Sequence, residues 1–600
     1  MLSYADIHLT YMLPAIGVLT LITLPFINRW ETSKIAFISA VALVYTTPCY
    51  NYNIINGTRS YSTGRVSAVV GNVPVEEYMS VVLQIVLTSL WAVLCVRWRL
   101  PFLNFNHDKR SYQLTRWVPI LLLSVTTAVG YGMAVPGRQT FYLGNILCWA
   151  SPVIMLMWYG AGNYFVKNMR LSSVAIAIPT LYLLWVNRIA LREDVWHLNK
   201  TTSLNVTLAW DLPLEEALFT VITTAIVVLA GTCYDKAYGM IVTFSLMYPI
   251  QFSYSWKFIS QMFRAFATSE YSMPSIVTED LKKCIKVLDA SNIFGTSNYL
   301  FHIGTRLDLI IIYTLGRITD NVVDDTSALN AEKLKSKLKL YYKFVKEQFA
   351  DRKSDYDVKS TPHEVDIDWT QYESVLPDVE LASFRALARI AFFLPRKPFE
   401  EVLAGFKLDM GGTLYRNEND LLRFCNNVAG TFGALFVYIV MYRYNLDKYE
   451  FLEKDDFLIK KSYQIGNGLQ FINIARDLIN DSEKLGRCYF PTEYMDDEVE
   501  EVRILCKERN PRSLGNKKLQ RYARKMIKMA NKHHFEAVDV IKCLPREIRG
   551  LTLTSIDIYR GLINSIQSSP SFPNKAKLSK LDKCLIILKG LYIKSIQYVV

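Results

Sequence analysis

The 600-residue sequence lacks the features of several common enzyme classes. Its ten cysteines include no C-x-x-C pair, so their spacing indicates neither a zinc site nor a disulfide framework. It has no glycine-rich phosphate loop and no strand-rich region, so nothing points to a nucleotide-binding α/β fold. Charge is scarce at the start: residues 1–234 carry 15 Lys+Arg and 10 Asp+Glu, against 53 and 45 in residues 235–600. The first part is therefore too apolar for an ordinary soluble domain.

The overall charge excludes one class of partner. A formal net charge of +13, shared between both parts of the chain, suits a membrane surface or anionic substrates. It is too modest and too dispersed for a dedicated nucleic-acid binder, so no nucleic-acid partner is expected. Scattered cysteines are expected to be reduced thiols on the cytosolic side of a membrane.

The apolar part contains seven runs near the length of about 20 residues that crosses a bilayer. They lie near 7–27, 33–50, 74–96, 117–136, 142–162, 171–190 and 212–234. The loop 97–116 is the most basic, so the positive-inside rule places it in the cytosol. Counting spans from that loop puts the N-terminus outside and residues 235–600 in the cytosol. The stretch 239–256 is interrupted by Pro249 and is predicted to be interfacial.

Two of these runs open on the same motif. Residues 74–77 read Pro-Val-Glu-Glu, and residues 213–216, 139 positions later, read Pro-Leu-Glu-Glu. Both motifs precede runs that cross the membrane in the same direction in our count. We therefore predict two parallel three-helix repeats, spans 1–3 and 5–7, joined by span 4.

The paired glutamates are the candidate acid–base residues of this part: Glu76, Glu77, Glu215 and Glu216. Carboxylates at membrane depth are costly and usually functional, although both pairs could also be helix N-caps at the outer interface. If the repeats bring one member of each pair together, mutual repulsion would leave one protonated acid and one ionised base. That arrangement suits proton addition to and removal from an apolar substrate. A retinal Schiff base is not indicated, because residues 212–234 contain no lysine, and a seven-span receptor or transporter does not explain duplicated glutamates.

The charged part contains a second duplicated spacing. Asp320 and Asp324 are four residues apart, as are Asp477 and Asp481, and both pairs lie in helix-period sequence. Such a pair alone is usually a solvated helix face. Two such faces opposite each other would surround a cavity with four carboxylates, which repel unless hard cations lie between them. Mg²⁺ binds a few carboxylates together with substrate phosphates, so the spacing predicts Mg²⁺-diphosphate chemistry in a helical bundle.

Other polar side chains share the faces of these aspartates. Tyr313 and Arg317 precede Asp320 at helical spacing, and Gln470 and Asn473 precede Asp477 in the same way. Downstream, Arg487 supplies a guanidinium suited to bidentate phosphate contact. A solvated surface does not explain this set of side chains.

On these motifs, residues 280–565 resemble the squalene/phytoene synthase family, an all-α family that joins two prenyl diphosphates head to head. The resemblance implies catalytic roles for Asp320, Asp324, Asp477 and Asp481. It implies that the substrate-binding residues are Tyr313, Arg317, Gln470, Asn473, Arg476, Arg487 and Tyr489. It also implies metal ligands at Asp320, Asp324, Asn473, Asp477 and Asp481, with Mg²⁺ as the cofactor, Mn²⁺ as an alternative, and no NADPH. Gly405 and Asp409 fit a further family position, whereas Phe424 replaces the usual tyrosine.

Residues 1–240 resemble the membrane lycopene cyclases, whose two halves each carry a Pro-x-Glu-Glu segment. The order of the two parts is similar to that of the bifunctional enzymes of carotenogenic fungi. Some positions depart from the pattern. Cys49 and Tyr50 stand where Trp-Asp is expected, Asn187 where Asp is usual, and Ser80, Val81 and Thr220 where aromatic residues are common.

Together these observations predict an all-α protein: a seven-span membrane cyclase domain (1–240), an interfacial linker (241–274) and an all-α isoprenoid-synthase-like bundle (275–600). The implied function is carotenoid biosynthesis, by condensation of two geranylgeranyl diphosphates to phytoene and cyclisation of lycopene through γ-carotene to β-carotene. The expected partners are geranylgeranyl diphosphate, lycopene, the lipid bilayer and a phytoene desaturase. The alternative is a phytoene or squalene-type synthase whose seven-span part is a non-catalytic anchor.

Overall fold

The computed structural model describes residues 2–208, 211–289, 294–324, 331–359, 361–445, 456–568 and 572–594. These residues form two compact units, Met1–Thr278 and Glu279–Val600, which are described separately below. The described part of both units is helical, with two small two-stranded sheets in the first. The predicted all-α fold class is confirmed.

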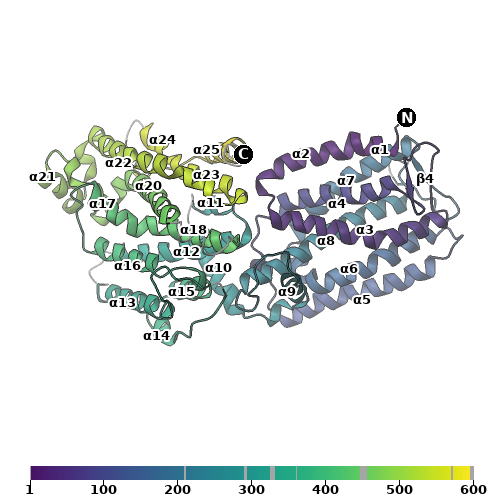
Figure 1. Ribbon diagram of the computed structural model, residues 1–600, viewed down its shortest axis with the longest axis horizontal. Coiled ribbons are helices and arrows are strands. Elements are labelled where there is room, and N and C mark those ends of the chain that lie inside the picture. The colour runs from purple at the N-terminus through teal and green to yellow at the C-terminus, as the bar shows by residue number, and fades with distance from the viewer. Residues whose placement is uncertain are drawn as a thin grey trace. The chain divides into compact units, whose positions relative to one another are not determined.

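The first unit is a bundle of long helices that run side by side (Figure 1). Its helices are α1 (Tyr4–Ile7), η1 (His8–Met12), α2 (Leu13–Thr23), η2 (Leu24–Phe26), α3 (Arg29–Ile55), α4 (Val75–Val96), η3 (Pro101–Asn104), α5 (Lys109–Met133), α6 (Phe141–Lys167), α7 (Met169–Arg192), α8 (Leu214–Thr243), α9 (Trp256–Ala267) and η5 (Glu270–Ser272). Its strands are β1 (Arg59–Tyr61), β2 (Val69–Val70), β3 (Val73–Pro74) and β4 (Trp196–Leu198).

Seven helices in the described part of the chain are long and apolar enough to cross a membrane, and six of them coincide with predicted spans. The remaining predicted span, 33–50, lies in α3, a 27-residue helix that is not among the seven. Lys34 of α3 is buried and forms ion pairs with Glu31 at 2.7 Å and with Asp235 of α8 at 2.9 Å. Glu31 and Lys34 are thus paired inside the bundle, and these charges reduce the hydropathy of α3 without preventing its packing there.

The seventh apolar helix is Glu418–Arg443 of the second unit, which the sequence analysis did not count as a span. It comprises α17 (Glu418–Cys425), the π-helical turn η8 (Asn426–Gly430) and α18 (Thr431–Arg443). Of its most apolar window, 61% is buried inside the protein. A helix that is apolar on every side is expected in the core of a large bundle as well as in a membrane, so hydropathy alone does not separate the two.

The duplicated motifs occupy matching positions in the first unit. Pro74 and Pro213 are the N-caps of α4 and α8, with nearly equal backbone angles of φ −56°, ψ 143° and φ −59°, ψ 138°. Strands β1 and β4 pair antiparallel, with Arg59 opposite Leu198, which is also 139 residues later. Inside the bundle, Gln84 Nε2 donates a 2.7 Å hydrogen bond to Thr223 Oγ1, again 139 residues away. The repeats therefore meet at equivalent residues, as a two-fold relation requires.

The second unit is a helical bundle around α20 (Asp456–Asn480), which continues into the π-helical turn η9 (Asp481–Leu485). Its other helices are α10 (Ser275–Asp289, which begins in the first unit), α11 (Phe294–Asn298), α12 (Ile303–Val323), α13 (Ala331–Gln348), α14 (Thr370–Glu373), α15 (Asp378–Ile390), η7 (Ala391–Phe393), α16 (Lys397–Met410), η10 (Thr492–Tyr494), α21 (Glu498–Val502), η11 (Arg503–Lys507), η12 (Pro511–Leu514), α22 (Asn516–Ala537), η13 (Val538–Cys543), α23 (Arg546–Arg560), α24 (Leu562–Gln567), α25 (Lys580–Lys589) and η14 (Gly590–Lys594).

Glycine allows α20 to approach its neighbours closely. A Cβ on Gly466 would overlap the carbonyl oxygen of Ala429, and one on Gly433 would overlap that of Ser462. Any side chain at either position would force α20 away from η8 or α18. This contact fixes the helix that carries the second aspartate motif.

Candidate active sites

Arg59 lies between the two glutamate pairs of the membrane unit. Its Nη1 donates to Glu77 Oε1 at 2.6 Å and its Nη2 to Glu216 Oε1 at 2.5 Å. Tyr61 OH also donates to Glu77 Oε1 at 2.8 Å, and Tyr142 OH of α6 donates to Glu216 Oε1 at 2.8 Å. The repeats thus bring one glutamate of each pair to a shared guanidinium.

The other two glutamates bind loops instead. Glu76 Oε1 accepts a 2.7 Å hydrogen bond from the backbone N–H of Ser67. Glu215 Oε1 accepts bonds from the backbone N–H of Leu204 at 2.6 Å and from Ser203 Oγ at 3.0 Å. Both side chains are therefore held against the segment that precedes their helix, and neither α4 nor α8 has a side-chain hydrogen bond at its N-cap.

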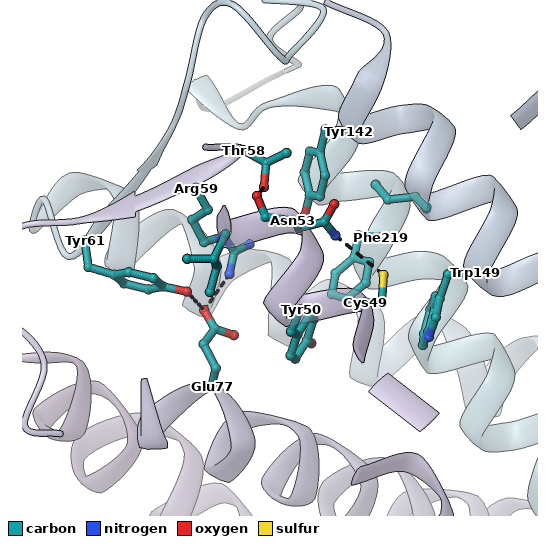
Figure 2. Close-up of a pocket in the computed structure, with 12 residues that line it drawn as sticks. Cys49, Tyr50, Asn53, Thr58, Arg59, Tyr61, Glu77, Tyr142, Trp149 and Phe219 are labelled. Carbon is teal, nitrogen blue, oxygen red and sulfur yellow. Dashed lines mark hydrogen bonds and ion pairs between the residues drawn. The ribbon is translucent and has the colours of Figure 1, made fainter. Parts of the chain in front are cut away.

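A pocket opens beside Glu77 (Figure 2). Figure 2 shows the Arg59 and Tyr61 side chains directed at the Glu77 carboxylate, with the Tyr50 ring beside them. The lining residues, drawn from α3, β1, α4, α6 and α8, are Cys49, Tyr50, Asn53, Ile54, Thr58, Arg59, Tyr61, Glu77, Tyr142, Ile146, Trp149 and Phe219. An acidic group beside aromatic faces, which carry negative π-density, can stabilise a cation in an apolar ligand.

Four of the departures noted in the sequence lie in this pocket or are hydrogen-bonded, directly or through one another, to Glu216. Cys49 and Tyr50 line it directly. Asn187 Nδ2 donates a 3.0 Å hydrogen bond to Thr220 Oγ1, and Thr220 Oγ1 donates to the backbone carbonyl of Glu216 at 2.8 Å. Asn187 and Thr220, two of the departures, are therefore hydrogen-bonded to each other. The Asn187 amide supplies an N–H donor that an aspartate would lack.

Sequence reasoning did not identify Arg59, Tyr61 or Tyr142. It expected simple repulsion between neighbouring glutamates, whereas the structure shows a cation bonded to both carboxylates. A signal was present, because Arg59 stands at the repeat offset from Leu198, an apolar residue. Where one repeat has a charged residue and the equivalent residue of the other repeat is apolar, the position has a polar role in one repeat only.

In the second unit the first aspartate motif lies at the end of α12. Arg317 Nη1 donates to Asp320 Oδ2 at 3.0 Å. Burial, followed by repulsion from Asp324, raises the pKa of the Asp320 carboxyl to about 6. The Asp320 side chain keeps 48% of its surface exposed. Asp320 is therefore crowded by protein on one side and exposed to solvent on the other.

Arg487 connects the first motif to two other segments. Its Nη1 donates to Asp324 Oδ1 at 2.9 Å and to Asp409 Oδ2 at 3.0 Å, and its backbone N–H donates to the carbonyl of Asp481 at 3.1 Å. Tyr489 OH donates to Asp409 Oδ1 at 2.8 Å. The two aspartate motifs and α16 thus converge on one arginine.

The second motif follows along α20. Arg476 forms a bidentate ion pair with Asp477, which Lys575 Nζ approaches to 3.9 Å. Burial, followed by repulsion from Asp477 and Asp324, raises the pKa of the Asp481 carboxyl well above its ordinary value. The repulsion from Asp324 places carboxylates of both motifs in one electrostatic environment.

The remaining predicted residues surround this group. Asn473 Nδ2 contacts Gln470 Oε1 at 3.5 Å, and Asn473 Oδ1 accepts a 2.8 Å hydrogen bond from Tyr559 OH of α23, a residue that the sequence did not single out. Tyr313 stacks on Phe294 with ring centroids 4.3 Å apart, so its ring is positioned by aromatic packing.

Phe424, which replaces the tyrosine usual in the family, is buried in an aromatic stack. Its ring lies 5.5 Å from that of Tyr489 and 5.2 Å from that of Tyr415. Through Tyr489, this stack supports the residue that bonds Asp409. Phe424 therefore takes part in the aromatic stack and brings no hydroxyl to it.

The donor set fits a hard divalent cation. Among the described residues, no three His, Cys, Asp or Glu side chains form a ready metal site. Arg317, Arg476 and Arg487 instead bind Asp320, Asp477 and Asp324. Nevertheless, carboxylate oxygens are the ligands Mg²⁺ prefers, and the crowding that raises the pKa of Asp320 and Asp481 is what an added cation would relieve.

Comparison with known proteins finds similarity over both units of the chain. Residues 290–582 match the family model described as squalene/phytoene synthase. The predicted family resemblance is confirmed. The proteins named bifunctional lycopene cyclase/phytoene synthase in Phycomyces blakesleeanus and Blakeslea trispora are each 28% identical, covering 99% and 98% of this chain and 96% of each relative. The protein of that name in Neurospora crassa is 27% identical over 99% of this chain and 100% of its own.

Among solved structures, a dehydrosqualene synthase in complex with ligand matches with a TM-score of 0.38 and 17% identity. The match covers 53% of this chain and 97% of that chain. The squalene/phytoene synthase match lies in the second unit, and the three relatives extend over both units of the chain.

Proposed function

We propose that the second unit condenses two geranylgeranyl diphosphates to phytoene. The strongest support is the set of hydrogen bonds that Arg487 donates. They reach Asp324, Asp409 and the backbone carbonyl of Asp481, which belong to three separate segments. The Arg487 guanidinium, with those of Arg317 and Arg476, provides donors for diphosphate oxygens. The family match and the names of the relatives support the same assignment.

In this proposal Asp320, Asp324, Asn473, Asp477 and Asp481 would hold Mg²⁺, or Mn²⁺ in its place. The bound cations would neutralise charge on the leaving diphosphate. The arginines stabilise the negative charge that develops as the allylic C–O bond breaks. Tyr313, Gln470 and Tyr489 complete the substrate-binding set. Tyr489 acts partly by holding Asp409 in place.

The assignment is tested with the full chain in membranes supplied with labelled geranylgeranyl diphosphate and Mg²⁺. We expect phytoene as the product, its loss with EDTA, and its loss in Asp320→Asn and Asp477→Asn. Unchanged substrate turnover in either variant contradicts the proposal, and a reduced product that depends on NADPH would identify a squalene-type synthase.

We also propose that the membrane unit cyclises lycopene through γ-carotene to β-carotene. The supporting observation is the acidic pocket in which Arg59 links Glu77 and Glu216 beside aromatic side chains. A carboxylic acid there can protonate a terminal alkene, and a carboxylate can remove a proton after ring closure. The reaction needs no redox cofactor because no electrons are gained or lost.

Lycopene-accumulating cells that express the full chain test the second activity. The formation of β-ionone rings supports it. Phytoene formation without any ring, in the same cells, would favour the alternative that the membrane unit is an anchor, which the departures at Cys49, Tyr50 and Asn187 make worth testing. Comparing γ-carotene with β-carotene shows how many rings are formed.

We further propose that the chain is a multi-pass membrane protein with the synthase on the cytosolic side. The basic loop 97–116 and the six apolar helices of the first unit that coincide with predicted spans support this arrangement. A phytoene desaturase would then receive phytoene and return lycopene at the same bilayer. Protease treatment of sealed vesicles from expressing cells, with antibodies to the second unit, tests the side. Protection of that unit in cytosol-outward vesicles contradicts the proposal.

A further inference from the structure

The contacts of Arg59 break an otherwise symmetric arrangement. Glu77 and Glu216 occupy equivalent repeat positions, and both bind the same guanidinium. The repeat equivalent of Arg59 is Leu198, its partner in the β1–β4 pairing, so this pairing brings only one cation to the centre. The Arg59 guanidinium also lies 4.2 Å from the Trp196 ring centroid, which holds it in place.

The three side chains are buried together. Their exposed fractions are 13% for Arg59, 6% for Glu77 and 2% for Glu216. With both glutamates ionised, the group carries a net charge of −1 in an apolar bundle, which is costly. Uptake of one proton makes it neutral, with one glutamic acid and one carboxylate paired to Arg59. The neighbouring ionisable groups that are neutral in their ordinary forms are Tyr4, Tyr50, Tyr61, Tyr142, Cys49 and His8. The buried carboxyl groups of Glu76 and Glu215 adjoin the triad in the chain and are hydrogen-bonded to their loops.

We infer that Glu77, Arg59 and Glu216 form a triad that holds one exchangeable proton and performs the acid–base chemistry, whereas Glu76 and Glu215 are structural ligands of their loops. This inference rests on the proposed cyclase function and deepens it. Arg59 is a positioning residue, because it acts through the two carboxylates. The Glu77 carboxylate forms part of the pocket wall and meets the substrate directly.

For each ring formed, the triad gives one proton to the substrate and takes one back. The protonated glutamic acid gives its proton to one carbon of the terminal double bond, and a C–H bond forms while the neighbouring carbon becomes cationic. A second double bond of the substrate supplies the electron pair for the new ring C–C bond, which moves the positive charge to a ring carbon. A triad carboxylate then removes a proton from an adjacent carbon, and those C–H electrons form the new double bond. The triad is at −1 only while the cation exists, so its charge stabilises the intermediate.

The loop contacts explain the other two glutamates. Glu76 and Glu215 each accept a backbone N–H from the segment before their helix, at 2.7 Å and 2.6 Å. A glutamine side chain keeps a carbonyl oxygen and can accept the same bond. The Glu→Gln change therefore removes acid–base chemistry from the triad positions but preserves the structural bond at the loop positions.

The experiment compares Glu→Gln variants of the full chain in lycopene-accumulating cells, with phytoene formation as the internal control for folding and membrane insertion. We expect Glu77→Gln and Glu216→Gln to lose β-ring formation by on the order of 10²-fold. Glu76→Gln and Glu215→Gln should retain more than about a tenth of the parental level, because the loop bond persists. Equal losses in all four variants would overturn the division of roles.

Arg59 is tested by two further variants. Arg59→Gln should lose ring formation as severely as the triad glutamate variants, because the carboxylates lose their shared cation. Arg59→Lys restores the positive charge on one nitrogen in place of the two that bond Glu77 and Glu216, so it should form more rings than Arg59→Gln but fewer than the parental chain. Normal ring formation in Arg59→Gln would overturn the triad. Ring formation in Arg59→Lys no higher than in Arg59→Gln would overturn it as well. If the parental chain forms no ring at all, the proposed cyclase function itself fails, which distinguishes the two cases.

Discussion

Arg487 and Asp324 are 163 residues apart in the chain, and their side chains form a 2.9 Å ion pair. The same guanidinium nitrogen reaches Asp409 at 3.0 Å. A single side chain therefore pairs with two carboxylates, one at the C-terminal end of α12 and one in α16. The guanidinium carries further N–H donors on separate nitrogens in a planar fork, whereas the lysine ammonium has its three donors on one nitrogen.

We predict that Arg487→Lys lowers kcat/KM for geranylgeranyl diphosphate by about 10- to 10²-fold, because directed donors to Asp324, Asp409 and diphosphate are lost. Steady-state phytoene formation at saturating Mg²⁺ measures the effect. Arg503→Lys is the matched control, since Arg503 is 50% exposed and its ion pairs are with Glu500 and Glu508 on the surface. An equal loss in both variants would show that general charge, not the site, is responsible.

We predict a pH-dependent difference between the parental protein and Asp320→Asn. The pKa of Asp320 is raised from 3.8 to about 6, so the folded unit disfavours its ionised form. The contribution of the protonated carboxyl to stability is complete below about pH 3.8 and is lost as the pH rises through 6. The asparagine side chain carries no charge, so the variant should gain stability relative to the parent as the pH rises from 4 to 7.

Amide hydrogen exchange of α12 (Ile303–Val323) in the full chain with EDTA measures this difference. Exchange in the variant should slow relative to the parent by up to about tenfold at pH 7, after correction for intrinsic rates, and match it at pH 4. Added Mg²⁺ should cancel the difference by stabilising the parental carboxylate. A variant that exchanges faster at pH 7 with EDTA would contradict a strained charge at Asp320.

The same residues show how far the sequence alone could go. The spacing of Asp320 and Asp324 predicted a shared helix face, because helical periodicity depends on local sequence. The bonds of Arg59 to Glu77 and Glu216 could not be derived in this way, since they depend on how β1 pairs with β4 across 139 residues. Helix Glu418–Arg443 shows the reverse limit: its apolar composition suits a membrane, yet 61% of its most apolar window is buried in the protein.

Our last prediction concerns the turn that positions Arg487. Gly486 ends η9 with φ 65°, a left-handed conformation, and a Cβ there would lie 2.8 Å from the carbonyl oxygen of Cys506. Gly486→Ala should destabilise the second unit by about 1–2 kcal/mol from the backbone alone, and by more from the contact. Gly412 has φ 61°, and a Cβ added there would meet no atom within 4 Å, so Gly412→Ala isolates the backbone cost.

The two variants are compared by denaturant unfolding of the full chain. Amide exchange of α20 reports the unfolding of the second unit. The difference in stability between them measures the contacts of the added Cβ with the Cys506 carbonyl and the Arg509 side chain. We also expect Gly486→Ala to lower phytoene formation more than Gly412→Ala, because a shift of the turn moves the adjacent Arg487 away from Asp324 and Asp409. Two variants with equal stability and equal activity would show that the backbone of Cys506 yields freely, and that the turn at Gly486 does not hold Arg487 in place.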